Sequence, residues 1–171
     1  MLSPALETLA KPFFEEADIS YDTSADGGAL SVLLTSPDCN LQFAVIDYAR
    51  LGMLSVECWN ITRFEAIDST ATQLANDLNR KHPGKFTIDN KGGLDYCFEL
   101  RVTEHTVPAD FGEVFRRTVA IVHENYATIM KARWGAMNHN GTSKRKRQRK
   151  DPSKHDKDIA QLIEEALQQE D

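Results

Sequence analysis

The chain has 171 residues, of which 41% are hydrophobic, and this size predicts one domain of ordinary core plus an extension. Its formal net charge of -6 divides unevenly, because residues 1–134 hold 12 Lys and Arg against 19 Asp and Glu, whereas residues 135–171 hold 8 against 7. An acidic body argues against a nucleic-acid-binding face on the folded domain, since phosphate neutralisation needs clustered cations.

Cysteine usage and the N-terminus bear on the compartment. Cys39, Cys58 and Cys97 are odd in number and widely spaced, so neither a disulfide framework nor a zinc knuckle is indicated. Prolines and charged residues interrupt residues 1–14, and no apolar run approaches the length of a membrane span. The sequence therefore predicts a cytoplasmic protein with reduced thiols.

The first part of the chain is predicted to be a helix followed by three strands. Ser3 and Pro4 are typical of a helix start, and Pro12 makes this helix short or kinked. After the turn at Gly27-Gly28, alternating apolar residues predict an antiparallel meander of three strands, at Ala29–Thr35, Leu41–Asp47 and Met53–Trp59. The second face of this meander includes Leu33, Ala44 and Ile46, so a partner or another copy of the chain is expected to cover part of it.

The remainder of the body is predicted to be a helix, a hairpin and a long helix. The expected ranges are Glu65–Lys81 for the helix, Lys85–Asp89 and Leu94–Val102 for the hairpin, and Pro108–Trp134 for the long helix, ended by Gly135. The order is α-β-β-β-α-β-β-α, an α+β fold with helices packed on one face of a five-stranded antiparallel sheet. Residues 1–135 form this domain, and residues 136–171 form a basic flexible linker and a short amphipathic helix.

A family resemblance rests on the middle of the chain. It is carried by the order of elements and by Leu74, Leu78-Asn79-Arg80, Gly84-Lys85-Phe86-Thr87-Ile88-Asp89, Gly93-Leu94 and the apolar alternation to Leu100. Over about residues 5–134 the chain resembles the YbjN-like family of bacterial proteins, described as sensory-transduction regulators with a fold similar to type III secretion chaperones. The resemblance implies a non-enzymatic, often dimeric domain that binds protein segments or other partners, and it brings no catalytic residues with it.

Motifs of catalysis are not found in the sequence. There is no Gly-x-Ser-x-Gly elbow and no phosphate loop, and His123-Glu124 lacks the second histidine of a zinc protease because position 127 is alanine. Asp95 and Glu99 share a strand face about 13 Å apart, too far to act together on one bond. No catalytic residue, metal site or cofactor is therefore expected.

Four polar or aromatic residues receive structural interpretations. Asn79 and Arg80 stand at a helix end, where capping of the terminal carbonyls is favoured over a ligand-binding role. Trp59 and Trp134 are interpreted as packing anchors, with the exposure of Trp134 left open.

A basic run follows the domain. Six of the eight residues 143–150 are cations: Lys144, Arg145, Lys146, Arg147, Arg149 and Lys150. Three interpretations stay open, namely a solvated linker, contact with nucleic acid or another polyanion, and docking onto the acidic body. Because no aromatic residue is interleaved with the cations, a nucleic acid would be contacted through its phosphates.

The last predicted element is an amphipathic helix. Its apolar stripe consists of Ile159, Leu162, Ile163, Ala166 and Leu167. A helix of this length is marginal alone in water, so it is expected to dock on the chain's own sheet or in a partner's groove. The family resemblance implies a homodimeric, non-enzymatic protein-binding adaptor or chaperone-like regulator, and the tail is predicted to be an additional interaction element. The alternative is a regulator that binds a polyanion through residues 144–150.

Overall fold

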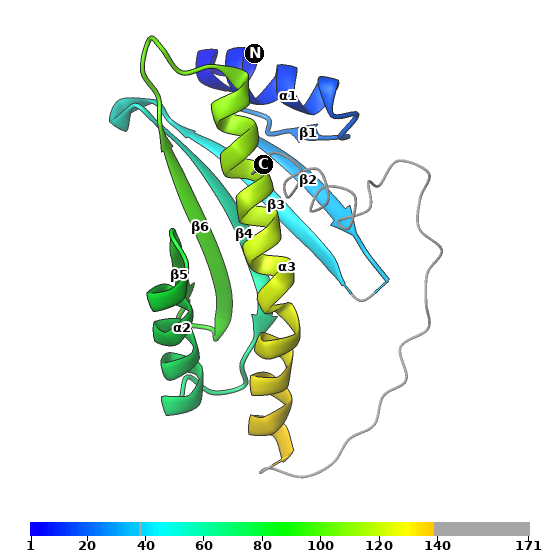
Figure 1. The fold of residues 1–171 in the computed structure, drawn as a ribbon, viewed down its shortest axis with the longest axis vertical. Coiled ribbons are helices and arrows are strands. Elements are labelled where there is room, and N and C mark those ends of the chain that lie inside the picture. The colour runs from blue at the N-terminus through cyan, green and yellow to red at the C-terminus, as the bar shows by residue number, and fades with distance from the viewer. Residues whose placement is uncertain (38, 139–171) are drawn as a thin grey trace, which may run out of the picture.

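The computed structural model describes residues 1–37 and 39–138, which form an antiparallel sheet with helices packed on one face (Figure 1). In chain order the elements are η1 (a π-helical turn, Leu6–Ala10), α1 (Lys11–Glu16), β1 (Asp22–Thr23), β2 (Ala29–Thr35), β3 (Asn40–Tyr48), η2 (a 3-10 turn, Ala49–Leu51), β4 (Met53–Arg63), α2 (Ser69–Lys81), β5 (Lys85–Ile88), β6 (Gly93–Arg101) and α3 (Pro108–Asn138). The basic run and the apolar stripe of the tail lie outside the described residues. None of the helices in the described ranges is long and apolar enough to cross a membrane.

The sheet has six strands in the order β1-β2-β3-β4-β6-β5, and every neighbouring pair is antiparallel. The predicted meander and hairpin are confirmed by the pairing of β2 with β3, β3 with β4, and β5 with β6. The expected number of five strands is wrong, because Asp22–Thr23 adds a short edge strand against β2. Two exposed polar residues carry no alternating pattern, so no sequence signal indicates this strand.

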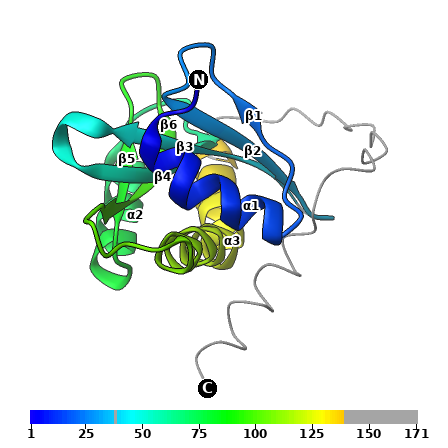
Figure 2. The same ribbon diagram turned by 90° about the horizontal axis from the view of Figure 1, so that it is seen from above.

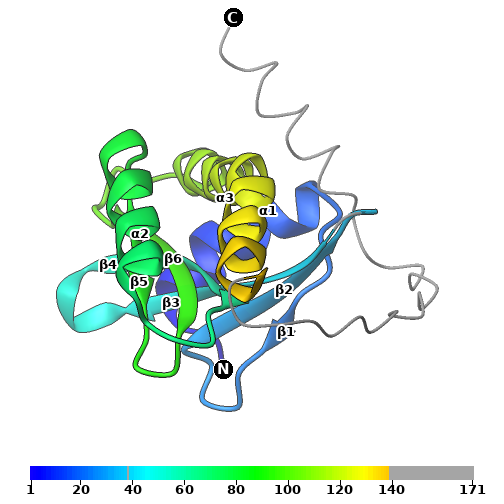
Figure 3. The same ribbon diagram turned by 90° about the horizontal axis from the view of Figure 1, so that it is seen from below.

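All three α-helices lie on the same side of the sheet, as the two end-on views show (Figures 2 and 3). Helix α3 runs along the sheet and contacts β4 and β6, while α2 lies beside β5 and α1 lies across the start of α3. The rings of Phe13, Phe14, Phe111 and Phe115 meet between α1 and α3, with centroids 5.0 to 6.1 Å apart. Phe115 also reaches Phe43 of β3, at 5.9 Å. This aromatic cluster joins the two helices to the sheet.

The first helix contains Pro12 and continues through it by means of a π-helical turn. Ser3 caps its start, because its Oγ accepts a hydrogen bond from the Leu6 amide at 3.4 Å. The turn η1 is π-helical, and the Lys11 amide bonds the carbonyl of Leu6, five residues earlier. This wider turn lets the chain continue through Pro12, which has no amide hydrogen to contribute.

Three predicted boundaries are wrong, each for a local reason. Strand β4 continues four residues past Trp59, because a bulge at Asn60 absorbs the irregularity and pairing resumes at Thr62. Helix α2 begins at Ser69 rather than Glu65, since the Asp68 carboxylate accepts from the Ala71 amide and caps the helix. Ile67, which falls inside the predicted helix, precedes α2 and is exposed. Helix α3 passes through Gly135 to Asn138.

The β5 edge of the sheet is closed by a side chain. The Asn79 carboxamide, on the last turn of α2, accepts from the Phe86 amide at 2.6 Å and donates to the Phe86 carbonyl at 2.9 Å. It thus makes the two hydrogen bonds that a neighbouring strand would make. The prediction that Asn79 caps helix carbonyls is wrong, and Arg80 makes only an exposed ion pair with Asp77.

We expect Asn79→Ala to lower the free energy of unfolding by about 1–3 kcal/mol, because both main-chain groups of Phe86 lose a partner at a half-buried site. Asn76→Ala, an exposed position on the same helix, is the matched control and is expected to change stability by less than about 0.5 kcal/mol. Urea unfolding at neutral pH measures both values. Equal effects of the two substitutions would contradict the role given to Asn79.

Candidate functional site

The face of the sheet opposite to the helices, which we call the open face, carries a mixture of aromatic, apolar and acidic side chains. Its residues follow from the alternation of the strands and their register, and one lateral row runs through Ser31, Ala44, Glu57, Cys97 and Lys85. A second row comprises Ala29, Ile46, Ser55 and Glu99. Side chains from five strands therefore meet on one surface.

Glu57 lies in the middle of this face and is held by two aromatic residues. One of its carboxylate oxygens accepts from Nε1 of Trp59 at 2.6 Å, and the other accepts from the Tyr48 hydroxyl at 3.3 Å. Burial raises the pKa of Tyr48, and the charge of Glu57 raises it further. Because each aromatic ring is tied by its polar end, both rings are positioned before any partner arrives.

The bulge in β4 sets the position of Trp59. Asn60 has a left-handed backbone, with φ of 50°, which asparagine tolerates better than most residues. Its amide donates to Oδ1 of Asp95 on β6 at 2.7 Å, so the bulge is fixed from the neighbouring strand. Trp59 is therefore attached to a rigid part of the sheet rather than to a loop.

Carboxylates surround Cys97 on the open face. Burial raises the pKa of the Cys97 thiol, and Glu57, Glu99 and Asp95 raise it further, whereas Lys85 lowers it. The thiol thus stays protonated at neutral pH, which disfavours a role as a nucleophile. The three carboxylates outnumber the two cations of the neighbouring positions, Lys85 and Arg101, so this part of the face is acidic on balance.

Large side chains with apolar surface are exposed on the same face. Leu33 is 48% exposed and Trp59 is 42% exposed, and Tyr48 is exposed to a similar degree. Between them lie the small side chains of Ala44 and Ser55, which are buried by their neighbours. Exposed aromatic and aliphatic residues around small ones are typical of protein-binding surfaces.

The outer edge of β2 adjoins this face. The Asp47 amide donates to the Gly28 carbonyl, and the Ser36 amide donates to the Cys39 carbonyl. In β2 the main-chain groups of even-numbered residues therefore bond β3, and those of odd-numbered residues point away from β3, toward the outer edge. Strand β1 covers this edge only near Leu30 and Ser31. Within the described residues, the outward main-chain groups of Leu33 and Thr35 are left without a strand beside them.

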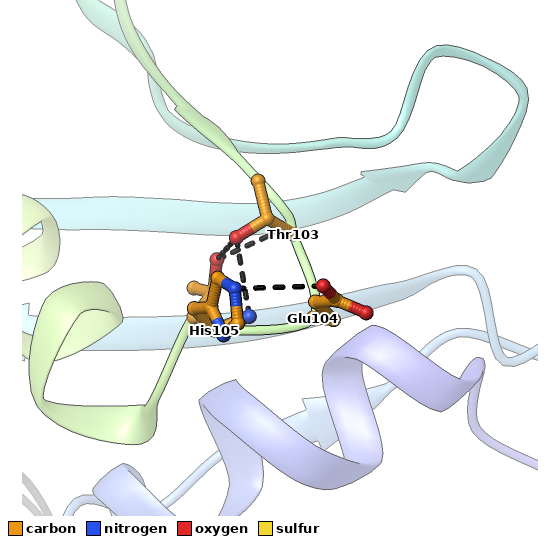
Figure 4. A network of polar contacts seen from close by, with 4 residues as sticks. Thr103, Glu104 and His105 are labelled. Atoms are coloured by element: carbon orange, nitrogen blue, oxygen red, sulfur yellow. Dashed lines mark hydrogen bonds and ion pairs between the residues drawn. The ribbon is translucent and has the colours of Figure 1, made fainter.

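A separate group of polar residues lies in the loop between β6 and α3 (Figure 4). The hydroxyl of Thr106 accepts from the Thr103 amide at 2.9 Å, and His105 lies 3.4 Å from the carboxylate of Glu104. Both side chains of that His–Glu pair are almost fully exposed. These contacts shape the turn that leads into α3 and do not make a binding site.

The remaining titratable residues of the described part of the chain are dispersed. No three His, Cys, Asp or Glu side chains come together there as a metal would require. Burial raises the pKa of Cys58, and His82 meets only the Asn125 carboxamide, at 3.0 Å. Asp95 and Glu99 lie on the open face with Cys97 between them along the strand, as the sequence predicts.

The interpretation of Trp59 as a packing anchor is wrong, because its ring is on the open face. Trp134 is more exposed still, at 52%, near the end of α3. The roles of Glu57 and Tyr48 were not predicted at all. An alternating pattern in β4 does indicate which residues face away from the core, since Leu54, Val56 and Cys58 are apolar and buried and the residues between them lie on the open face. The pairing of β3 with β4, which brings Tyr48 to Glu57, has no such signal in the sequence.

Comparison with known proteins adds no relative, since no family model and no curated protein matches the chain. The resemblance to the YbjN-like family therefore stays a prediction.

The open face has a pH dependence that can be tested at Asp95. Burial raises the pKa of Asp95, and Asp89 and Glu57 raise it further, while the bond from the Asn60 amide lowers it. Since the folded-state pKa is above the unfolded one, this carboxyl stabilises the fold when protonated. That contribution is complete below the ordinary pKa of about 3.9 and is lost as pH rises through the folded-state value.

We therefore expect the wild type to gain stability relative to Asp95→Asn as pH falls from about 7 to about 3. The substitution removes the titration and retains the oxygen that accepts from Asn60. Urea unfolding of both proteins across this pH range gives the difference directly. A difference that is constant with pH would contradict the raised pKa.

Proposed function

We propose that this chain is a non-enzymatic protein-binding adaptor whose open face binds a segment of a partner protein. The observation that carries the proposal is the exposed, hydrogen-bonded Trp59–Glu57–Tyr48 group in the middle of that face. Tryptophan and tyrosine are the residues that most often dominate binding energy at interfaces. Here their orientation is already fixed, so little rotamer entropy is lost on binding.

The chemistry of the face defines the kind of segment that fits. Leu33 and Trp59 offer apolar contact area, whereas Glu57, Asp95 and Glu99 contribute negative charge. The complementary segment is amphipathic, with apolar side chains toward the sheet and Lys or Arg at its margin. Arginine would also stack on the exposed tryptophan ring. A chaperone-like regulator that holds basic amphipathic segments accords with the family resemblance.

The first test compares two exposed tryptophans. We expect Trp59→Ala to weaken partner binding by at least about 2 kcal/mol, roughly thirtyfold, as is usual for an interface tryptophan. Trp134→Ala is the control, because Trp134 has similar exposure but lies on α3, away from the open face. The partner is identified by photo-crosslinking from position 33 in cells that express the chain, and its affinity is then measured calorimetrically with purified proteins.

If Trp59→Ala and Trp134→Ala lose partner affinity equally, or if both bind the partner as the wild type does, the open face is excluded as the binding site. Recovery of nucleic acid in place of protein, with affinity that falls steeply with salt and depends on residues 144–150, would favour the polyanion-binding alternative.

We propose further that the homodimer forms through the free part of the β2 edge. If two copies meet antiparallel about a two-fold axis at Leu34, Leu33 of each copy lies opposite Thr35 of the other. The outward amides and carbonyls of these two residues then make four hydrogen bonds. The same axis brings the two open faces into one continuous surface.

Leu33→Pro tests this dimer, because proline removes one outward amide hydrogen and breaks no bond to β3. We expect its dimer dissociation constant to rise at least about tenfold, since each copy loses a main-chain hydrogen bond at the axis. Leu33→Ala, which retains the amide, is the control for the lost side chain. Sedimentation velocity over a concentration series measures both variants, and an unchanged dimer in Leu33→Pro would rule this edge out.

A further inference from the structure

The open face and the tail of the chain are complementary in two separate respects. The face carries carboxylates beside exposed apolar rings, and the tail carries six cations in residues 143–150 followed by the apolar stripe from Ile159 to Leu167. The tail thus has the properties that the proposed function requires of a partner segment. The acidic body, with 12 cations against 19 acids in residues 1–134, adds a general attraction.

We propose that residues 144–167 dock on the open face of the same molecule and compete there with the protein partner. In this arrangement the basic run lies over Glu57, Asp95 and Glu99, and the apolar stripe lies against Leu33 and Trp59. The inference rests on the proposed function in one respect, namely that the partner uses this face.

The end of α3 places the tail within reach of that face. Nη1 of Arg133 lies 3.3 Å from Oγ1 of Thr62, so the last turns of the helix lie beside the far end of β4. Trp59 is three residues earlier on the same strand, about 10 Å along it. Lys144, the first cation of the basic run, is 6 residues beyond Asn138, up to about 20 Å of extended chain, and Ile159 is 21 residues beyond it, up to about 70 Å. That is enough to pass around the end of the sheet and back along its other face.

Because the tail is covalently attached to the domain, weak contacts are sufficient to keep it docked on the open face. Exposed ion pairs contribute at most about 1 kcal/mol each and are screened by salt, so the free segment would bind the face weakly. A short flexible tether, however, gives an effective concentration on the order of mM. An intrinsic dissociation constant of about 0.1 mM would then keep the tail docked about nine-tenths of the time, and it would weaken partner binding about tenfold. A partner with micromolar affinity would still displace it.

Trp59 reports on this docking when it is the only tryptophan. In the full chain carrying Trp134→Phe, we expect acrylamide to quench Trp59 at least about twofold less efficiently than in the same chain with Leu162→Asp and Leu167→Asp, since the docked stripe shields the ring. Gln161→Asp with Gln168→Asp adds the same charges to the polar side of the predicted helix and is the matched control. Replacing the six cations of the basic run with Gln should expose Trp59 as the stripe variant does.

A cross-link shows whether docking occurs within one molecule. Cys97 is the one cysteine of the described chain that is not buried, and it lies beside Glu57 on the open face. With Gln148→Cys, a position inside the basic run, and a short bis-maleimide at mildly alkaline pH, we expect a peptide cross-link between positions 97 and 148 in a product of monomer mass. A cross-linked product of dimer mass overturns the intramolecular proposal.

Equal quenching of Trp59 in all variants, or quenching that is unchanged by salt up to about 0.5 M, also overturns the proposal. Binding of a polyanion by the intact chain with no change in Trp59 quenching does the same, because the basic run would then be free of the face. None of these measurements contains the partner, so the docking of the tail and the partner-binding function can fail independently. If Trp59→Ala loses partner binding while the tail variants leave Trp59 quenching unchanged, the partner-binding function is retained and the docking of the tail is excluded.

Discussion

The packing of α3 against the sheet is the interaction on which the rest of the structure depends. Gly112 lets α1 pack closely on the outer side of this helix, because a Cβ atom at this position would lie 2.7 Å from the Phe13 ring of α1. Phe111 and Phe115 then interleave with the two phenylalanines of α1, and Phe115 reaches β3. Since α1 contacts α3 and α2 lies beside both α3 and β5, the helical layer is built around this one helix. All helices of residues 1–37 and 39–138 are thereby committed to a single face of the sheet.

A sheet with one covered face must make the other face stable through its own side chains. In this chain it does so with small residues in the centre, such as Ala44 and Ser55, and with a hydrogen-bonded acid between two aromatic rings. The result is a surface that is well ordered and still partly apolar. Such a surface is suited to binding because its side chains are fixed in advance, and our proposals for a protein partner and for the chain's own tail both rest on this property.

The sequence predicts most of the fold because its patterns are strong where one face of an element is buried. The strand range Ala29–Thr35 is confirmed to the residue. The apolar pattern of the long helix predicts a stripe of Phe111, Phe115, Val119, Val122, Tyr126, Ile129 and Met130, and all of these are buried except Tyr126 and Met130, which are half-buried. The errors occur where a single side chain sets the structure: Asp68 at the start of α2, Asn60 at the bulge, and Asn79 at the sheet edge. These contacts join residues by tertiary geometry, which periodicity does not encode. The open face was expected to be partly covered, but Trp59 and Glu57 were not identified as its centre.

The Asn79 carboxamide has a consequence for assembly. It bonds the outward amide and carbonyl of Phe86, so a strand that approached the β5 edge would find these two groups already occupied. Open sheet edges can add copies without limit and grow into a fibre. By bonding Phe86, one amide side chain on α2 makes the β5 edge a poorer template for such growth.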